Sequence, residues 1–235
     1  KDQADELRAQ GIEVRSVDEN TVAYAYGARL RTSTNYGGSW TERSLDHILP
    51  PMALLMGYSD PATYLRINDD IFMRSVYGRP EAYVPYYEAL VLRSEDGGET
   101  FEAITIGQDD EEKLSFGETA IGLAPNDDIV AMMRNDPSPQ PEFNGYFLRN
   151  VSVDKGATWE TPVLTPVWGY PGHLLRTSSG YLICTYGYRR DDKGIRAVIS
   201  LDNGRTWDLH NMIILRNDGE SANPSNLGYP VTVET

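Results

Sequence analysis

An eight-residue pattern, Ser-x-Asp-x-Gly-x-Thr-Trp, occurs four times in this chain and constrains the fold more than any other feature. The copies begin at Ser33, Ser94, Ser152 and Ser200, and the first copy has Asn in place of Asp. A short apolar run with high β propensity comes before the later copies, which predicts a hairpin turn between two strands. The Asp or Asn oxygen can accept hydrogen bonds from its own turn, and the Gly supplies the positive φ that a tight turn requires.

The last position of the pattern is aromatic in every copy. The four residues are Trp40, Phe101, Trp159 and Trp207. A large ring that follows a tight turn is placed to pack beneath it, so we expect all four turns to be equivalent, on an outer rim, each with its ring buried.

The four copies resemble the Asp-box (bacterial neuraminidase) repeats of the sialidase superfamily. The resemblance implies an all-β fold of the β-propeller type, six-bladed in the family, with each box between the third and fourth strands of a blade. The box itself is structural, and it also occurs in propellers that hydrolyse no sialic acid. It therefore indicates the fold far more than the function.

The order of predicted strands fits a single sialidase-like propeller domain over residues 1–235. A short helix over 2–10, ended by Gly11, precedes about four blades. One further strand, Tyr229–Val233, then opens a fifth blade. Four blades and one strand do not close a six-bladed ring, and an open ring leaves exposed sheet edges. We expect an incomplete ring, to which a missing segment or an additional chain contributes the rest.

The charge composition limits the classes of partner that this chain can bind. A formal net charge of −14 disfavours nucleic acid and anionic membrane surfaces, because both would be repelled. No apolar run is long enough to span a membrane. An acidic sugar would also be repelled, unless a local cluster of arginines overcomes the global field. The compartment stays open, with a secreted or periplasmic location somewhat favoured.

Metal and cysteine chemistry find little support in the sequence. The single cysteine, Cys184, excludes an internal disulfide and a multi-cysteine metal site, and its apolar surroundings favour a buried structural role. The acidic run 109–112 is interpreted as a solvated loop, with a metal site as the alternative. No pair of histidines has the spacing of metal ligands, so we predict neither a catalytic metal nor a cofactor.

Sialidases use a tyrosine nucleophile, helped by a glutamate, and three arginines that hold the substrate carboxylate. A neutral phenol approaches an anionic sugar more easily than a carboxylate does, and a guanidinium fork binds a carboxylate bidentately. The resemblance assigns Glu118, at the head of a strand, to the base and Arg134, after the following turn, to the arginines. Alternatively, Glu118 caps a rim and Arg134 pairs with Asp136.

Other candidates follow from the same resemblance. Arg196 is the first choice for the next arginine and Arg189 is close behind; pairing of Arg189 and Arg190 with the acidic residues after them is the alternative. Tyr229 has the place of the nucleophile.

Two candidates are weaker. His173 heads an equivalent strand, with a structural role as the alternative. Arg66 occupies the nearest equivalent of the early family arginine, and Asp69 or Asp70 that of the acid/base aspartate shortly after it. The family's proline is missing there, and the segment follows the first repeat instead of preceding it. Four tyrosines between Tyr77 and Tyr87 form either a solvated loop or part of a sugar-binding face.

The function that these residues favour is an exo-acting glycoside hydrolase that releases a terminal sialic acid or a related acidic sugar. A non-catalytic propeller that binds glycans or proteins is the second interpretation, and a polysaccharide lyase that uses Tyr229 and His173 is the third. The hydrolase hypothesis makes a structural prediction: the Tyr229 hydroxyl lies within hydrogen-bond reach of Glu118, and Arg134 shares the pocket.

Overall fold

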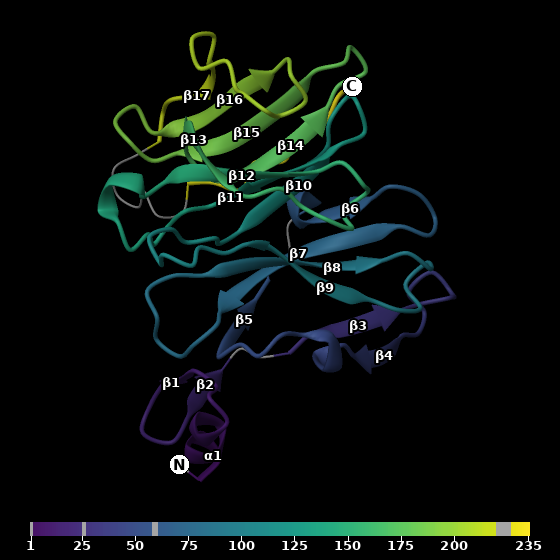
Figure 1. The fold of residues 1–235 in the computed structure, drawn as a ribbon, viewed down its shortest axis with the longest axis vertical. Coiled ribbons are helices and arrows are strands. Elements are labelled where there is room, and N and C mark those ends of the chain that lie inside the picture. The colour runs from purple at the N-terminus through teal and green to yellow at the C-terminus, as the bar shows by residue number, and fades with distance from the viewer. Residues whose placement is uncertain (1, 25–26, 58–60, 220–226) are drawn as a thin grey trace.

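The computed structural model describes residues 2–24, 27–57, 61–219 and 227–235. In these residues the fold is all-β, built from antiparallel sheets that follow one another along the molecule (Figure 1). The first elements are α1 (Asp2–Ala9), followed by Gly11 with a φ of 81°, and the hairpin of β1 (Val14–Ser16) and β2 (Val22–Tyr24). The predicted N-terminal helix is therefore present and ends where glycine allows it to end.

The remaining strands form four sheets, and short 3-10 helices lie between some of them. The strands are β3 (Arg29–Thr32) and β4 (Thr41–Ser44); β5 (Leu54–Met56), β6 (Tyr64–Arg66), β7 (Phe72–Arg79), β8 (Glu88–Ser94) and β9 (Glu102–Gly107); β10 (Thr119–Leu123), β11 (Ile129–Met133), β12 (Tyr146–Ser152) and β13 (Val163–Trp168); and β14 (Tyr170–Arg176), β15 (Leu182–Tyr188), β16 (Gly194–Ser200) and β17 (Ile213–Arg216). The 3-10 helices are η1 (Asp46–Ile48), η2 (Pro61–Thr63) and η3 (Pro141–Phe143).

Consecutive sheets pack face to face, and β11 shows why. Successive side chains of a strand point to opposite faces of its sheet. Ile129, Ala131 and Met133 therefore pack against the β5–β9 sheet, whereas Val130 and Met132 pack toward the β14–β17 sheet. All five residues of β11 are buried, so this strand is a continuous apolar run rather than an alternating one.

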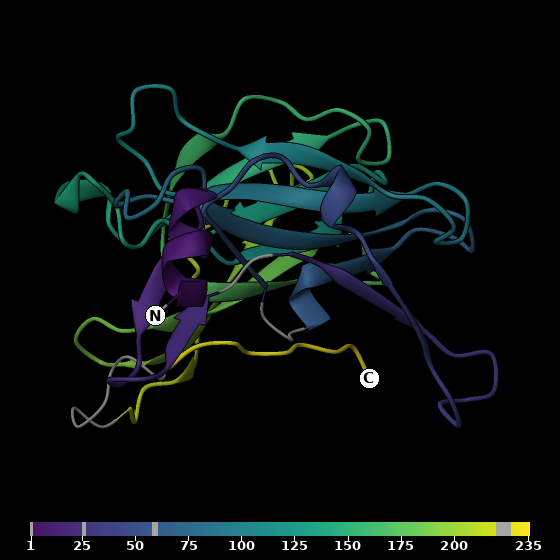
Figure 2. The ribbon, with the colours of Figure 1, turned by 90° about the horizontal axis from the view of Figure 1, so that it is seen from below.

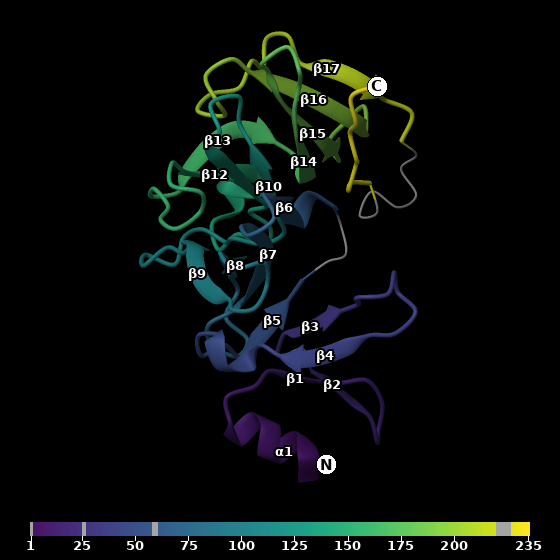
Figure 3. The same cartoon turned by 90° about the vertical axis from the view of Figure 1, so that its right-hand side faces the viewer.

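The four sheets form an open row. The β3–β4 sheet and the β14–β17 sheet lie at opposite ends of it (Figures 1 and 3), and no sheet in the described residues closes on itself. This agrees with the expectation that these residues do not form a sealed ring.

The four repeats form equivalent turns. In each turn the first Ser hydroxyl donates to the Asp or Asn oxygen two residues on, at 2.8–3.0 Å, and accepts from the glycine N–H at 2.8 Å. The same Asp or Asn oxygen accepts from the backbone N–H four residues on, at 2.7–2.8 Å. Each turn joins the last two strands of its sheet, as predicted.

Burial of the aromatic residue is not uniform. Trp207 is 7% exposed, Phe101 and Trp159 are half-buried, and Trp40 is 62% exposed. The prediction that all four rings are buried is therefore wrong for Trp40 and holds in full only for Trp207. The physical reason is the β3–β4 sheet, which has two short strands and leaves little surface for Trp40 to pack against.

Two further predictions need correction. Residues 229–233 are not a strand, and the segment 227–235 runs as an extended chain near β14 (Figure 2). Thr232 bonds to the side chains of His173 in β14 and Thr185 in β15, and Glu234 accepts from the N–H and hydroxyl of Ser178 in the turn after β14. Tyr77 is not in a loop but belongs to β7.

Cys184 is free and fully buried, as expected, and burial raises the pKa of its thiol to about 12.

The unequal burial of two tryptophans predicts unequal contributions to stability. Trp207→Ala should lower the free energy of unfolding by about 3–5 kcal/mol, because it leaves a cavity among packed side chains. Trp40→Ala should change it by less than about 1 kcal/mol, because the indole is largely in solvent. Equilibrium urea unfolding measures both values, and equal losses would contradict this account of the turns.

Candidate active site

The site is built first from two adjacent strands. Glu118 immediately precedes β10, and Arg134 immediately follows β11. Because these strands are antiparallel, the two residues lie at the same end of the sheet, where the Arg134 N–H donates to the Glu118 carbonyl at 3.0 Å. The Gly117 N–H donates to the Arg134 carbonyl at 2.8 Å. The backbone therefore fixes the spacing between the carboxylate and the guanidinium.

Tyr229 reaches this pair from the C-terminal segment. Its hydroxyl donates to Glu118 Oε1 at 2.6 Å across 111 residues of sequence, as the hydrolase hypothesis predicts. The backbone of Tyr229 has a φ of 58°, a left-handed conformation that a bulky residue adopts rarely and at some cost in energy. Contacts of the surrounding structure offset that cost, and the phenol is directed toward the carboxylate.

Arg134 is held from two sides. Its guanidinium lies 2.5 Å from Glu118 Oε2 and 2.5 Å from Asp136 Oδ2, so both interpretations of the sequence describe real contacts. Burial lowers the pKa of Arg134, but the two carboxylates outweigh it and raise that pKa above its ordinary value. Glu118 thus accepts from the phenol on one oxygen and from the guanidinium on the other.

Arg189 is the second arginine of the site. Its guanidinium carbon lies 4.1 Å from the centre of the Tyr170 ring, and that of Arg134 lies 4.8 Å from the same ring. The Arg189 Nε donates to the Leu227 carbonyl at 2.7 Å, but Arg189 forms no ion pair with any described residue. Burial and the nearby positive charge of Arg134 lower the pKa of Arg189. The Tyr170 ring therefore holds two like charges together.

Tyr77 also faces the site. Burial and the negative charge of Glu118 raise the pKa of its phenol, and its ring meets that of Tyr87 edge to face with centroids 5.3 Å apart. Tyr77 belongs to the tyrosines that the sequence offered as part of a sugar-binding face, whereas Tyr170 was not singled out. The only available signal was weak, namely that tyrosine is frequent in this chain and occurs near strand ends.

Arg196 is not brought to the Glu118–Tyr229 pair. It is 2% exposed, its guanidinium donates to the carbonyls of Asp192 and Arg216, and it stacks on Tyr188. This geometry uses the side chain to join β16 to its neighbours. Of the two alternatives that the sequence left open for this arginine, Arg189 is the one placed beside the pair.

His173 and Arg66 also make contacts outside the pair. His173 Nδ1 accepts from the Thr232 N–H at 3.4 Å, so this histidine supports the segment that carries Tyr229. Arg66 donates to the Asn68 carbonyl and forms an exposed ion pair with Asp69 at 2.7 Å. Its contacts stay within its own turn.

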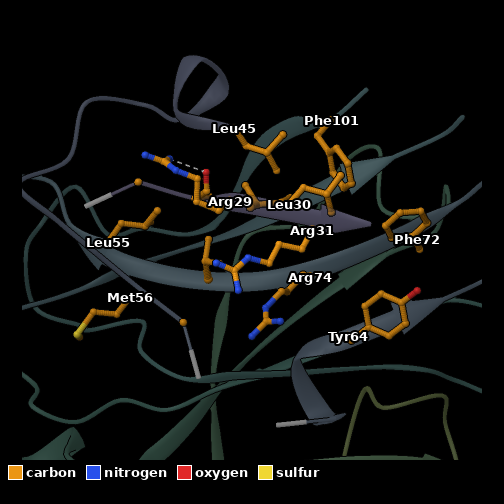
Figure 4. A pocket seen from close by; sticks show the side chains of 15 residues that line it. Arg29, Leu30, Arg31, Leu45, Leu55, Met56, Tyr64, Phe72, Arg74 and Phe101 are labelled. Atoms are coloured by element: carbon orange, nitrogen blue, oxygen red, sulfur yellow. Dashed lines mark hydrogen bonds between the residues drawn. The ribbon is translucent and has the colours of Figure 1, made fainter. Parts of the chain in front are cut away.

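A separate cavity of about 490 Å³ lies between β3 and the β5–β9 sheet. Arg29, Arg31, Arg74, Tyr64 and Phe72 are among its lining residues, and Figure 4 shows Arg31 and Arg74 directed toward its centre. Arg29 and Arg31 form ion pairs with Asp46 and Glu42. None of the lining residues belongs to the Glu118–Tyr229 site.

Metal-binding clusters and membrane-spanning helices are both absent from residues 2–24, 27–57, 61–219 and 227–235. No group of three or more His, Cys, Asp or Glu residues in them is arranged to hold a metal ion. No helix in the same ranges is both long enough and apolar enough to cross a membrane.

Comparison with known proteins supports the fold. No family model matches the sequence, and no curated protein sequence matches it. A crystal structure of a protein of unknown function from Dyadobacter fermentans aligns with a TM-score of 0.68 and 23% identity, over 94% of this chain and 60% of that one. The NanB sialidase from Streptococcus pneumoniae aligns with a TM-score of 0.53 and 17% identity, over 86% of this chain and 32% of that one.

These similarities define the class of protein by its fold alone. The chain has an all-β, sialidase-like fold, and it spans 60% and 32% of the lengths of the two structures just described. At identities below one quarter, the alignments carry no information about which reaction, if any, this chain performs.

The Tyr229–Glu118 contact predicts an unusual titration. Burial, the hydrogen bond and the charge of Glu118 raise the pKa of Tyr229 from 10.0 to about 12. A raised pKa means that folding favours the neutral phenol, so this contribution to stability is complete below pH 10 and is lost as the pH rises toward 12. NMR of isotope-labelled tyrosine, with Tyr229→Phe for assignment, should show a midpoint near 12.

Glu118→Gln provides the control for this titration. It removes the negative charge and leaves the burial, so the midpoint of Tyr229 should move down toward the ordinary value. A wild-type midpoint at the ordinary value, or one that Glu118→Gln leaves in place, would contradict the contact.

Proposed function

We propose that this chain is part of a sialidase-type β-propeller, and that it is an exo-acting glycoside hydrolase that releases a terminal sialic acid or a related acidic sugar. The single observation that carries the proposal is the hydrogen bond of 2.6 Å from the Tyr229 hydroxyl to Glu118, beside two arginines. A neutral phenol, a carboxylate base and guanidinium groups are the three components that such a reaction needs.

In the proposed reaction Tyr229 is the nucleophile. The phenol is neutral near pH 7, because its pKa of about 12 lies far above that pH, so it approaches an anionic sugar without repulsion. As its oxygen bonds to the anomeric carbon, its proton passes to Glu118 Oε1 and the glycosidic oxygen leaves with the bonding electrons. Water then attacks the anomeric carbon and the tyrosyl–sugar bond breaks, with Glu118 returning its proton to the departing phenolate. The proton that the water loses goes to solvent, which protonates the alkoxide or aryloxide released in the first step.

Arg134 and Arg189 bind the substrate carboxylate. Arg189 brings a guanidinium that no described carboxylate neutralises, and Arg134 lies over the same Tyr170 ring. When the substrate carboxylate takes a share of Arg134, that arginine neutralises Glu118 less. Glu118 then becomes a stronger base at the moment when the proton of Tyr229 must move.

The propeller assignment rests on three features. The sheets pack face to face in a row, the four repeat turns are equivalent, and the fold is similar to that of a sialidase. A closed ring would need further sheets beyond the open row of described residues. We propose that another segment or an additional chain supplies them.

A non-catalytic glycan-binding propeller is the second candidate. One observation favours it: Arg134 and Arg189 reach the site, whereas Arg66 and Arg196 make their contacts elsewhere, as does the exposed Asp69. A binding module needs neither a third arginine nor an acid for the leaving group. A lyase is less favoured, because Tyr229 is directed to Glu118 and His173 to Thr232.

An aryl sialoside is the substrate of choice for the test, because its aryloxide leaving group departs without help from an acid. Tyr229→Phe should lower kcat by at least about 1000-fold, since the nucleophilic oxygen is removed. Glu118→Gln should lower kcat by about 100- to 10,000-fold, since the base is lost. Tyr181→Phe, at an exposed tyrosine of the β14–β17 sheet region, is the control and should keep wild-type kcat. If the wild type binds sialosides but does not turn them over, the binding-module proposal replaces the hydrolase proposal.

The role of Arg189 has its own prediction. Arg189→Gln should raise KM for the same sialoside by roughly 10- to 100-fold, because a charge-assisted hydrogen bond contributes about 1.5–3 kcal/mol. The wild type should prefer the sialoside over a neutral analogue in which an amide replaces the carboxylate, and the variant should lose most of this preference. Kinetics on the two substrates measure the effect, and an equal loss on both would assign Arg189 to the fold instead of to the carboxylate.

A further inference from the structure

Arg190, next to Arg189, is a second cation that forms no ion pair with a carboxylate of the described residues. Its guanidinium carbon lies 4.3 Å from the centre of the Trp168 ring and 5.3 Å from that of Tyr146. Arg190 is exposed, and it forms no ion pair with any described residue, Asp191 and Asp192 included. The sequence alternative of pairing with those neighbours is therefore not realised.

The aromatic residues beneath Arg190 are themselves fixed. The Trp168 Nε1 donates to the Asn144 carbonyl at 3.0 Å, and the indole meets Tyr170 and Tyr188 edge to face at 5.2 and 5.5 Å. Gly145 has a φ of 82°, and a Cβ there would lie 2.4 Å from the indole nitrogen, so only glycine allows this close approach. The indole of Trp168 is therefore held in one position beneath Arg190.

Stacking orients a guanidinium without using its hydrogen bonds. Arg190 lies over the rings without a hydrogen bond to them, so its N–H groups stay available to an anion. An ion pair would have neutralised the charge instead. Aromatic contact thus preserves both the charge and the donors.

The two unpaired arginines lie close together. Arg189 stacks on Tyr170, Tyr170 contacts Trp168, and Arg190 stacks on Trp168. These three spacings, 4.1, 5.2 and 4.3 Å, limit the separation of the two guanidinium carbons to at most about 14 Å. Two linked sugars span such a distance. In a chain with a formal net charge of −14, two adjacent unpaired cations make a local exception to the global field.

We infer that Arg190, on its Trp168–Tyr146 platform, is a subsite for a second anionic group of the glycan. The inference rests on the proposed function, in which Arg134 and Arg189 take the terminal carboxylate. The preferred substrate is then doubly anionic: a terminal acidic sugar followed by a sugar that carries a carboxylate or a sulfate ester. Both groups present the same chemistry, an oxyanion that a guanidinium edge binds.

Calorimetric titration of the full chain tests the inference with three glycans that share one terminal acidic sugar. The neighbouring sugar is neutral in the first, carries a carboxylate in the second and carries a sulfate ester in the third. Tyr229→Phe is used throughout to prevent turnover. We expect the anionic glycans to bind roughly 2- to 5-fold more tightly than the neutral one, a gain typical of an exposed charge pair, and to lose this advantage in added salt.

Arg190→Gln should bring the ratio of the dissociation constants close to one, and Arg190→Lys should restore part of it. Arg176→Gln is the matched control. It removes the same charge from an exposed arginine of β14 that pairs with Asp127, and it should leave the ratio unchanged. A preference for only one of the two anions identifies which group the subsite takes and supports the inference.

Three outcomes overturn it. Equal binding of the neutral and anionic glycans shows that no anionic subsite exists, and a preference that persists in Arg190→Gln places the subsite elsewhere. An equal loss in Arg176→Gln shows that only the overall charge matters. Failure of the proposed function looks different, because it appears as absence of turnover in the wild type, whereas the subsite is tested by the ratio of the dissociation constants. If none of the three glycans binds, both the terminal-carboxylate site and the subsite are wrong.

Discussion

Burial of β11 on both faces is the constraint on which the rest of the structure depends. A strand with two apolar faces needs a sheet on each side, and the β5–β9 and β14–β17 sheets provide them. Once three sheets are stacked in this way, the ends of their strands come together at one side of the row. Glu118 and Arg134 stand at such an end, so the same packing that stabilises the fold also positions the first two groups of the site.

The site then combines segments that only tertiary structure brings together. Tyr229 belongs to an extended segment that side chains such as His173 and Thr185 attach to the last sheet. The attachment has an energetic cost, which appears as the positive φ of Tyr229, and the hydrogen bond to Glu118 repays part of it. Under the proposed function, this strained conformation is the one that directs the phenol toward Glu118.

Sequence was sufficient for those features that repeat or that have a local cause. The four turns follow from one pattern because Asp, Ser and Gly make their hydrogen bonds within eight residues. Glu118, Arg134 and Tyr229 were found through resemblance to a family, and their order along the chain anticipated the contact. Trp40 was mispredicted because the pattern carries no information about how much sheet lies beneath a turn, and the segment 229–233 because an apolar alternation does not specify a partner strand.

The arginines show most clearly where sequence reasoning stops. Arg189, Arg190 and Arg196 lie within eight residues, and each lies over an aromatic ring, but Arg196 is also buried and donates to two backbone carbonyls. Their partners, Tyr170, Trp168 and the Arg216 carbonyl, come from other strands, so no local spacing distinguishes the three. A guanidinium keeps its charge in any of these surroundings, but a ring leaves its N–H donors available, whereas each carbonyl or carboxylate contact uses one of them. The contacts of an arginine in this acidic chain come from distant parts of the sequence, and they determine how many of its donors remain available to a ligand.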